Sequence, residues 1–487
     1  MAISLLHHLT GHYPSFTLWA RKRGQAPART HPREYRDEKS MTNNHSALQL
    51  DTSDSTPELE ASYCGPLLMI ESHIIENRRQ IETWFREQWR KTPAPFYASV
   101  DLRNAGYKLG PVDTNLFPAG FNNLNHSFDP LVVQAIQSAV EHACPDARGM
   151  LIIPERHTRN QFYLESLATM AELFELAGFE TRIGSLDALD EPAHFDLPSG
   201  RTLTQHPIHR EGRRIEVDGF SPCTIVLNND LSGGREDILE DIEQTVVPPT
   251  ALGWWHRSKF NHFSHYQALA NELADLIDLD PWHLAPMILD CGQIDFMKRE
   301  GENCLQEKVS EMLAAIQKKY DELEIKEKPF VVIKADAGTY GMGVMMAQSA
   351  EEVVGLNRKQ RTRMAASKDG RSINRVLIQE GIYSFEKLGS SGHVAEPVLY
   401  MIDRHVVGGF YRVHTKKGQS ENLNSPGAEF VPLPFTQSCV TPAPGASPDS
   451  DQNRLYCYGV VARLALLAAA REQRDLIGGP ADAPSAG

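Results

Sequence analysis

The chain lacks several features that would place it in common classes of protein. Its formal net charge at pH 7 is −14, so it has no overall excess of basic residues with which to bind nucleic acid non-specifically. Its apolar runs are much shorter than the roughly 18 to 20 residues that a transmembrane helix needs. We therefore expect neither nucleic acid nor a membrane among its partners.

Cysteine is scarce and dispersed. The 7 cysteines form no C-x-x-C pair, and an odd, scattered set fits reduced thiols in a cytoplasmic protein better than a disulfide framework. No zinc-binding spacing occurs. His256, His262 and His265 lie close together in the sequence, but clustered histidines are more often surface or hydrogen-bonded core residues than metal ligands.

Two common phosphate-binding motifs are missing as well. The P-loop string G-x-x-x-x-G-K-[ST] does not occur. The Rossmann fingerprint requires a helix directly after its glycines, whereas the glycines near residue 340 are followed by the strand-like run Val344–Ala347. Neither of these two nucleotide-binding folds is therefore expected.

What is present indicates a folded α/β protein. The 487 residues, 41% of them hydrophobic, suffice for two or three domains. Residues 1–58 lack sustained periodicity and are predicted to be a disordered extension, with Met41 as an alternative start. In residues 59–325, strands such as 150–154 alternate with helices such as 163–177, which predicts an α/β domain with a mainly parallel sheet.

Polar residues follow two of the predicted strands. Glu155 and Arg156 come directly after strand 150–154, and Asn228 to Asp230 follow strand 223–228. Ligands of such sheets bind beyond the carboxyl ends of the strands. The position of these side chains, more than their polarity, makes them candidates for a site.

The most informative segment is Phe330–Met346, which is predicted to be a strand, a glycine-rich turn and a second strand. Glycines let backbone N–H groups approach an anion closely, and Lys334 at the end of the first strand supplies a point charge for phosphate oxygens. We therefore predict a nucleotide phosphate site; the alternative is an ordinary glycine-rich hairpin with a surface lysine. Its candidate residues are Lys334, Gly338, Thr339, Tyr340, Gly341 and Gly343.

This lid and the segments after it resemble an ATP-grasp carboxylate–amine ligase. Strand 375–382 resembles the hinge that reads adenine, which implicates Gln379, Glu380 and Ile382. The predicted hairpin 396–414 carries Arg412, which would stabilise the transferring phosphoryl group, unless it is an outward-facing strand arginine. The loop after it offers oxygen ligands for Mg²⁺, namely Glu421, Asn422 and Asn424, unless these residues only cap a turn.

The similarity to bacterial glutathione synthetase is distant and has one clear departure. That enzyme carries magnesium ligands on a late Asp and a Glu-x-Asn near its C-terminus. Here a predicted helix at 453–475 is followed only by a Pro, Ala and Gly-rich tail, 477–487. Either Glu421, Asn422 and Asn424 therefore take that role, or carboxylates elsewhere in the chain do.

A closer resemblance is to a proteobacterial family of glutamate–cysteine ligases. The strings that carry it are Val100–Leu124, which is dense in polar residues and glycine, Pro154–Asn160, and the lid Ile333–Gly343. It extends over about residues 59–476. The family implies ATP-dependent joining of the glutamate γ-carboxylate to the cysteine amine, with Lys334 and Arg412 as catalytic residues.

The resemblance and the residue chemistry together suggest where the amino acids bind. The guanidinium group of arginine can donate two parallel hydrogen bonds to a carboxylate, and Asp or Asn oxygens can accept from an ammonium group. The alternative is a polar loop held by its own hydrogen bonds. The candidates are Arg103, Asn104, Lys108, Asp113, Asn115, Asn122, Arg156 and Arg159.

We therefore predict an α/β domain over residues 59–325, followed by an ATP-grasp-like, two-lobed domain over residues 326–476. The predicted ligands are ATP, Mg²⁺, glutamate and cysteine, and homo-oligomers are common among such enzymes. Two alternatives stay open at this point. One is an ATP-grasp ligase with other amino-acid substrates, and the other is a noncatalytic nucleotide-binding regulator.

Overall fold

The computed structural model describes residues 64–156, 160–338, 343–365, 373–388, 392–433, 442–443, 445–447 and 450–477. The predicted extension 1–58 and the tail after residue 477 lie outside these ranges. Among the described residues, no helix combines the length and the apolar content that a membrane crossing requires.

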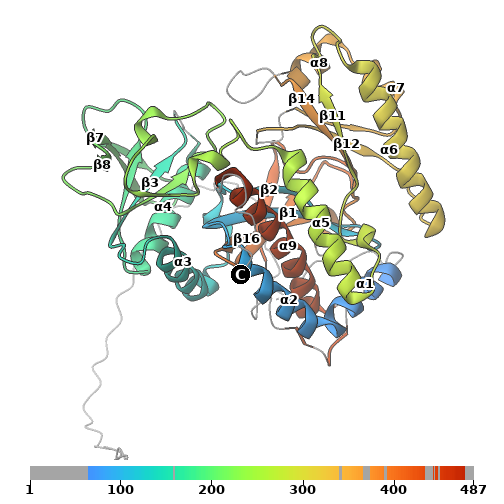
Figure 1. The fold of residues 1–487 in the computed structure, drawn as a ribbon, viewed down its shortest axis with the longest axis horizontal. Helices are drawn as coiled ribbons and strands as arrows, with labels where there is room; N and C mark the ends of the chain where they lie inside the picture. The colour runs from blue at the N-terminus through green and yellow to red at the C-terminus, as the bar shows by residue number, and fades with distance from the viewer. Residues whose placement is uncertain are drawn as a thin grey trace, which may run out of the picture. The chain divides into compact units, whose positions relative to one another are not determined.

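The central element is an antiparallel sheet that joins early and late parts of the chain (Figure 1). Its strand order is β18-β17-β16-β1-β2, and a short strand, β15, also pairs with β16. The strands are β1 (Tyr97–Asn104), β2 (Leu109–Asn115), β15 (Lys387–Leu388), β16 (His393–Ile402), β17 (His405–His414) and β18 (Ala428–Pro432). The string Val100–Leu124 therefore opens with two paired strands.

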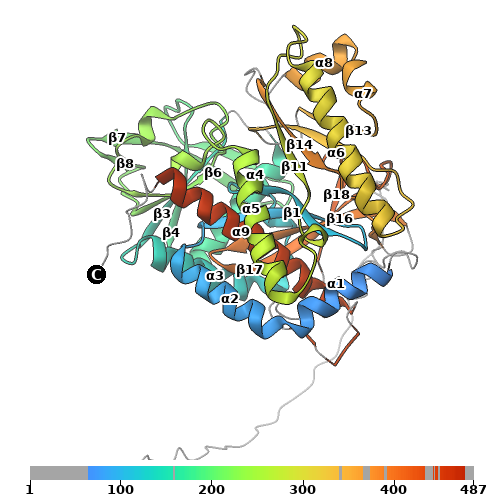
Figure 2. The ribbon, with the colours of Figure 1, turned by 45° about the vertical axis from the view of Figure 1, so that its right-hand side comes forward.

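One face of this sheet is buried against helices. Helix α9 (Asp451–Ile477) contacts β1, β2 and β16, and it packs along α5 (Lys259–Ile277). Its residues from Leu455 to Ala470 are almost all buried, because the segment is apolar on every side, as expected of a helix enclosed by a core. Figure 2 shows α9 in dark red among α5, α2 and the strands. Helices α1 (Cys64–Glu76) and α2 (Arg78–Lys91) complete this layer.

A second sheet contains the alternating elements that the sequence predicts. Its order is β10-β9-β3-β4-β6-β5, with parallel pairing from β10 through β6 and antiparallel pairing of β5 with β6. The predicted strands 150–154, 180–184 and 223–228 and the predicted helix 163–177 are confirmed. The elements are β3 (Gly149–Pro154), β4 (Glu180–Ser185), β5 (Ala193–Asp196), β6 (Thr202–Pro207), β9 (Thr224–Asn228), β10 (Thr245–Val247), α3 (Asp129–Ala143) and α4 (Gln161–Leu176). A separate hairpin pairs β7 (His209–Glu211) with β8 (Arg214–Glu216).

A third, four-stranded sheet has the order β11-β14-β12-β13 and contains the predicted lid strands. Helix α6 packs against it, with α7 and α8 beside it (Figure 1). The predicted strand pair around Lys334 is confirmed. The elements are β11 (Ile288–Gln293), β12 (Val331–Ala335), β13 (Val344–Ala347), β14 (Arg375–Glu380), α6 (Glu302–Glu322), α7 (Glu351–Val354) and α8 (Arg358–Ala365).

Strand pairing crosses the expected domain boundary at residue 326. Strand β1 lies before that position but pairs with β16, and β11 lies before it but pairs with β14. The division into two domains therefore stays a prediction. A boundary at residue 326 would separate strands that pair with each other.

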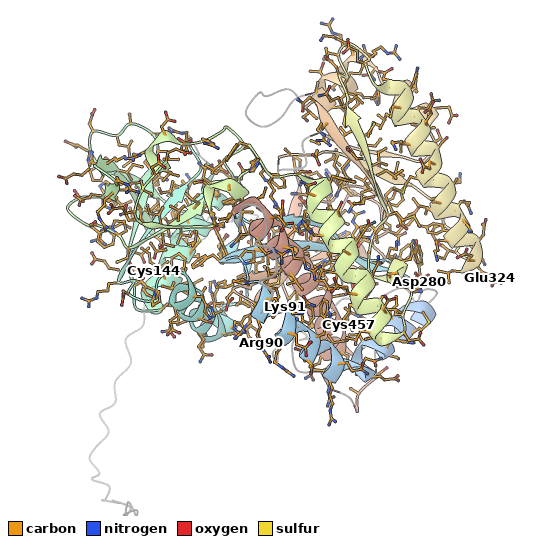
Figure 3. All side chains as sticks on the ribbon, in the orientation of Figure 1. Arg90, Lys91, Cys144, Asp280, Glu324 and Cys457 are labelled. Carbon is orange, nitrogen blue, oxygen red and sulfur yellow. The ribbon has the colours of Figure 1, made fainter. Side chains whose placement is uncertain are left out.

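Cys144, Cys223, Cys291, Cys304 and Cys457 are free cysteines. Figure 3 shows Cys144 near α3 and Cys457 on the central helix, in different parts of the fold.

Candidate active site

The face of the central sheet opposite α9 carries a row of charged side chains. Asp101 on β1 lies opposite Asp113 on β2, and Glu396 on β16 lies opposite Arg412 on β17. Residues directly opposite each other on antiparallel strands project to the same face. We call Asp101, Arg103, Asp113, Glu396 and Arg412 the charged row.

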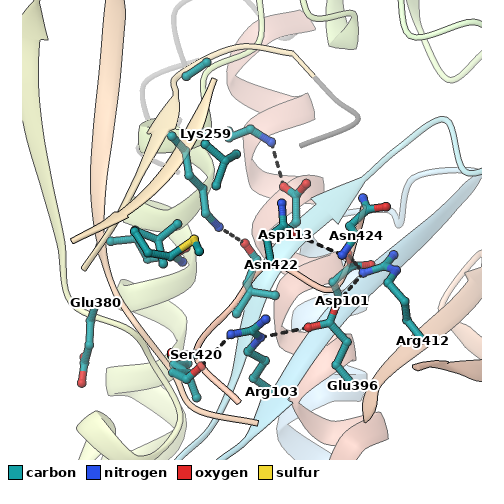
Figure 4. Close-up of a pocket in the computed structure, with 18 of the residues that line it drawn as sticks. Asp101, Arg103, Asp113, Lys259, Glu380, Glu396, Arg412, Ser420, Asn422 and Asn424 are labelled. Atoms are coloured by element: carbon teal, nitrogen blue, oxygen red, sulfur yellow. Dashed lines mark hydrogen bonds and ion pairs between the residues drawn. The ribbon is translucent and has the colours of Figure 1, made fainter. Parts of the chain in front are cut away.

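The charged row is held by buried ion pairs (Figure 4). Nη1 of Arg412 donates to Oδ2 of Asp101 and to Oε1 of Glu396, both at 2.7 Å. Nε of Arg103 donates to Oε2 of Glu396 at 2.9 Å, and its Nη1 donates to the carbonyl of Ile382 at 3.1 Å. The two arginines are therefore pre-positioned on a rigid sheet.

The pKa values in the row reflect burial and pairing. Burial alone would raise the pKa of Glu396, but attraction to Arg103 and Arg412 lowers it below its ordinary value. Burial alone would lower the pKa of Arg412, but Asp101 and Glu396 raise it. For Asp101 burial prevails over Arg412, and the pKa of this carboxyl is raised.

Two lysines face the charged row from other elements. Lys334, at the end of β12 as predicted, donates from Nζ to the carbonyl of Val112. Lys259, in the first turn of α5, donates from Nζ to Oδ1 of Asp113 at 2.8 Å. Burial lowers the pKa of Lys334 to about 8, although Asp113 opposes this shift. The same lysines hold the pKa of Asp113 well below its usual range, despite its burial.

Lys259 is a site residue that the sequence analysis missed. The apolar periodicity of the sequence favours a helix over residues 265–277, whereas α5 begins at Lys259, with Ser258 as its N-cap. Asp336, two residues after Lys334, accepts from the Ser258 hydroxyl at 3.0 Å and from the Phe260 N–H at 2.9 Å. The lid strand thus fixes the start of α5. The signal available in the sequence was the serine before this lysine, a residue type that favours the N-cap position.

A first cavity separates the charged row from the sheet that contains β12, β13 and β14. It brings together ten of the predicted site residues: Arg103, Asp113, Lys334, Gly338, Gln379, Glu380, Ile382, Arg412, Asn422 and Asn424. Its lining also includes Asp101, Lys259, Glu396 and Ser420, which were not predicted as site residues.

Gln379 and Glu380 have different roles in this cavity. The Gln379 side chain is buried, and its Nε2 has no hydrogen-bond partner in the described part of the chain, so it is a donor available to a ligand. The Glu380 carboxylate accepts from the Trp282 indole at 3.0 Å and from Lys108. Figure 4 shows Glu380 directed away from the charged row.

Lys108 and Asn104, both predicted to bind substrate, lie outside the cavity linings. Lys108 is buried, pairs with Glu380 and lies 4.0 Å from the centre of the Trp282 ring. Burial lowers its pKa to about 8. Asn104 donates to Glu386 at 3.0 Å and accepts from the Gly106 N–H at 3.0 Å. In this structure both side chains form contacts between segments that are distant in the sequence.

A second cavity adjoins the first. The two cavities share Asp101, Asp113, Arg412 and Asn424, so they meet at the charged row. The lining of the second includes the predicted residues Asn115, Asn122 and Arg156, together with Glu155, Asn228 and Asp230 beyond the ends of β3 and β9. The polar residues after these parallel strands therefore reach the same space as the charged row.

The predicted residues that line the second cavity differ in how many of their polar atoms have a hydrogen-bond or ion-pair partner. Arg156 pairs with Glu236 and lies 3.6 Å from Asp187. Asn115 accepts from the Phe117 N–H at 2.9 Å. The buried Oδ1 of Asn122 has no partner among the described residues and could accept from an ammonium group. Arg159, Thr339, Tyr340 and Gly341 lie outside the described residues, and Gly343 directly precedes β13 with a positive φ of 63°.

The predicted metal ligands are not equivalent. Asn422 and Asn424 line the first cavity, whereas the Glu421 carboxylate accepts from Lys417 at 3.0 Å and from the Gly418 N–H at 2.7 Å. In the described residues, no group of three or more His, Cys, Asp or Glu side chains could hold a metal ion. His262, from the histidine cluster, bonds instead to Thr114 at 2.9 Å. An ion at the cavity would therefore depend on amide oxygens and on the carboxylates of the charged row.

Comparison with known proteins gives the family. The glutamate-cysteine ligase model named GshA matches residues 71–473. A crystal structure of a proposed gamma-glutamylcysteine synthetase from Methylobacillus flagellatus KT is 52% identical, with a TM-score of 0.81, and the match covers 86% of this chain and 99% of that chain.

A glutathione synthetase-like effector (GSS30) from Globodera pallida, in its apo form, is 10% identical, with a TM-score of 0.29 that supports no argument; that match covers 76% of this chain and 80% of that chain. No curated protein matches this chain by sequence. The family model matches most of the chain and the crystal structure is 52% identical, so the chain belongs to the GshA family of glutamate-cysteine ligases.

Proposed function

We propose that this enzyme joins the γ-carboxylate of glutamate to the amine of cysteine, using ATP and passing through an acyl phosphate. The observation that carries the proposal is that two cavities meet at one charged row. The first cavity is lined by Lys259, Lys334 and Gly338, which suit phosphates, and the second has amide and carboxylate groups suited to amino acids. A ligase of this kind needs its nucleotide and its two amino acids to meet at one point.

The chemistry explains why these groups suffice without a covalent protein intermediate. A carboxylate does not react with an amine at neutral pH, because oxide is a poor leaving group. Attack of a γ-carboxylate oxygen on the terminal phosphorus of ATP releases ADP and forms the acyl phosphate. The amine nitrogen then attacks the acyl carbon, loses a proton and displaces inorganic phosphate. Both steps depend on positioning and charge neutralisation.

Each group of the first cavity has a role in this scheme. Lys334 and Lys259 neutralise phosphate oxygens, with Asp113 as the counter-ion of the free enzyme. Gln379 faces the adenine, for which it has a free donor. Arg412, where the cavities meet, stabilises the phosphoryl group in transfer. When bound, Mg²⁺ would neutralise charge on the phosphates, and Asn422 and Asn424 supply the oxygen atoms that this ion prefers.

The test is product analysis with labelled substrate. The purified full chain is given ATP, magnesium, cysteine and glutamate labelled with ¹⁸O in its γ-carboxylate. We expect ADP release that requires both amino acids, γ-glutamylcysteine by mass spectrometry, and one ¹⁸O atom in the phosphate released.

Other results separate the alternatives. Label-free phosphate with normal product would refute the acyl phosphate. Turnover with a different amino-acid pair would keep the ligase and change its substrates. ATP binding without turnover for any pair would favour the noncatalytic regulator.

A further inference from the structure

The second cavity has an aromatic side that the chemistry above does not use. Phe162 and Phe430 are 76% and 44% exposed, and both line this cavity. Phe162 projects from the first turn of α4, and Phe430 from β18. A large apolar side chain at a cavity mouth often marks a binding surface, because water contact with the ring is unfavourable.

The aromatic side is a connected set of rings. Phe430 meets Phe410 edge to face, with ring centroids 5.1 Å apart. Phe410 lies 5.6 Å from Tyr400, and Tyr400 lies 5.4 Å from Phe121. Tyr400 also donates its hydroxyl proton to the carbonyl of Ala119. We call Phe430, Phe410 and Tyr400, together with Phe162 in the lining of the same cavity, the aromatic wall.

The aromatic wall adjoins the charged row on the same sheet face. Phe430 on β18 is the register partner of Arg412 on β17, and Val398 on β16 is the partner of both Asp101 and Phe410. On this face of the sheet, the ion-paired residues and the aromatic residues are therefore only one or two residues apart. A substrate whose reacting group lies at Arg412 would place its neighbouring side chain against Phe430.

We infer that the aromatic wall binds the side chain of the acceptor amino acid and selects a thiol over a hydroxyl group. This inference rests on the proposed function. Glutamate has two carboxylates and an ammonium group, which require polar partners, so it suits the charged row and the asparagines. Cysteine has a side chain that can leave water. Sulfur makes favourable contacts with aromatic rings, whereas a serine hydroxyl placed there would lose its hydrogen bonds to water.

The experiment measures acceptor selectivity in variants of the full chain. Initial rates are determined at saturating ATP and glutamate with cysteine, with 2-aminobutyrate, whose methyl group replaces the thiol, and with serine. We expect Phe430→Ala to lower kcat/KM for cysteine and 2-aminobutyrate about tenfold, and for serine less than about twofold. Phe430→Leu, which keeps apolar volume but no ring, should recover 2-aminobutyrate more than cysteine. Phe162→Ala should resemble Phe430→Ala.

Leu176→Ala is the matched control, because Leu176 is 60% exposed at the other end of the helix that carries Phe162. It should leave all three rates unchanged. Equal losses for cysteine and serine in the phenylalanine variants would overturn the inference, and so would a rise confined to the KM for glutamate. These results leave the proposed function intact, whereas a wild-type enzyme with no turnover would overturn both.

Discussion

Nζ of Lys259 lies 2.8 Å from Oδ1 of Asp113, and Lys334 acts on the same carboxylate from the opposite sheet. One carboxylate on β2 thus balances two cations that come from a helix and from a lid strand. Under the proposed function, phosphates that enter the cavity would compete with Asp113 for both lysines. Four predictions follow from this arrangement and from the ion pairs around it.

Replacing Lys334 with methionine should lower kcat by about 100-fold or more, because a charge that neutralises the transferring phosphoryl group is lost. The fold should persist, and the melting temperature should stay equal or rise, because burial already opposes the charged form of this lysine. Lys318→Met is the control, since that side chain is 80% exposed on α6. Near-normal turnover of well-folded Lys334→Met would remove this residue from the site.

Binding of ATP should take up protons at alkaline pH. With a pKa of about 8, Lys334 in the free enzyme is mostly neutral at pH 8.5, and the phosphates should restore its proton. Affinity for ATP should therefore fall as pH rises above 8. Calorimetry at pH 8.5 in buffers of different ionisation enthalpy should show uptake of roughly three quarters of a proton. If Lys334→Met takes up as many protons as the wild type, a different group is responsible.

Arg412→Lys should lose activity more than stability. Lysine keeps the charge between Asp101 and Glu396 but lacks the planar fork of a guanidinium group. We expect kcat to fall by about 100-fold, with little change in the KM for ATP. Arg412→Ala should in addition lose roughly 3 to 5 kcal/mol of stability to urea, because it removes the ion-pair partner of Asp101 and leaves Glu396 with Arg103 alone. Equal stability of these two variants would show that the positive charge at residue 412 does not stabilise the fold.

Lys108→Met should destabilise the fold, since it leaves the buried Glu380 carboxylate without its ion-pair partner. A loss of roughly 3 kcal/mol is expected in urea unfolding. The double variant Lys108→Met with Glu380→Gln should recover part of that loss, because neither member of the buried pair then carries a charge. If the double variant is destabilised by the sum of the two single changes, the pair is not coupled. Substrate affinity that falls without any loss of stability would instead support the predicted role of Lys108 in binding.

Local patterns in the sequence predicted much of the lining of the first cavity. The lid strands around Lys334, the hinge strand with Gln379 and the hairpin that carries Arg412 are all formed by short segments. Successive side chains of a strand point to opposite faces, and this rule would have refined the prediction of which residues line the cavity. Gln379 and Glu380 are neighbours on β14, so their side chains point to opposite sides, and Arg103 and Asn104 on β1 divide in the same way.

The rest of the site depends on contacts between distant segments. Nothing local in the sequence indicates that β1 pairs with β16, and this pairing places Asp101 and Glu396 beside Arg412. Lys259 was missed because its helix begins earlier than the apolar periodicity suggests, at a cap fixed by Asp336 from the lid. The meeting of the two cavities is likewise a property of the assembled sheet.

The pairing of β1 with β16 also has a consequence for synthesis of the chain. A ribosome delivers β1 and β2 early, but their partners β16 and β17, and the helix α9 that covers them, emerge only after most of the protein has been made. During that interval the sheet has an unpaired edge and an uncovered apolar face, which are features that favour aggregation. We therefore expect β1 and β2 to stay exposed to aggregation on the nascent chain until β16, β17 and α9 have been made.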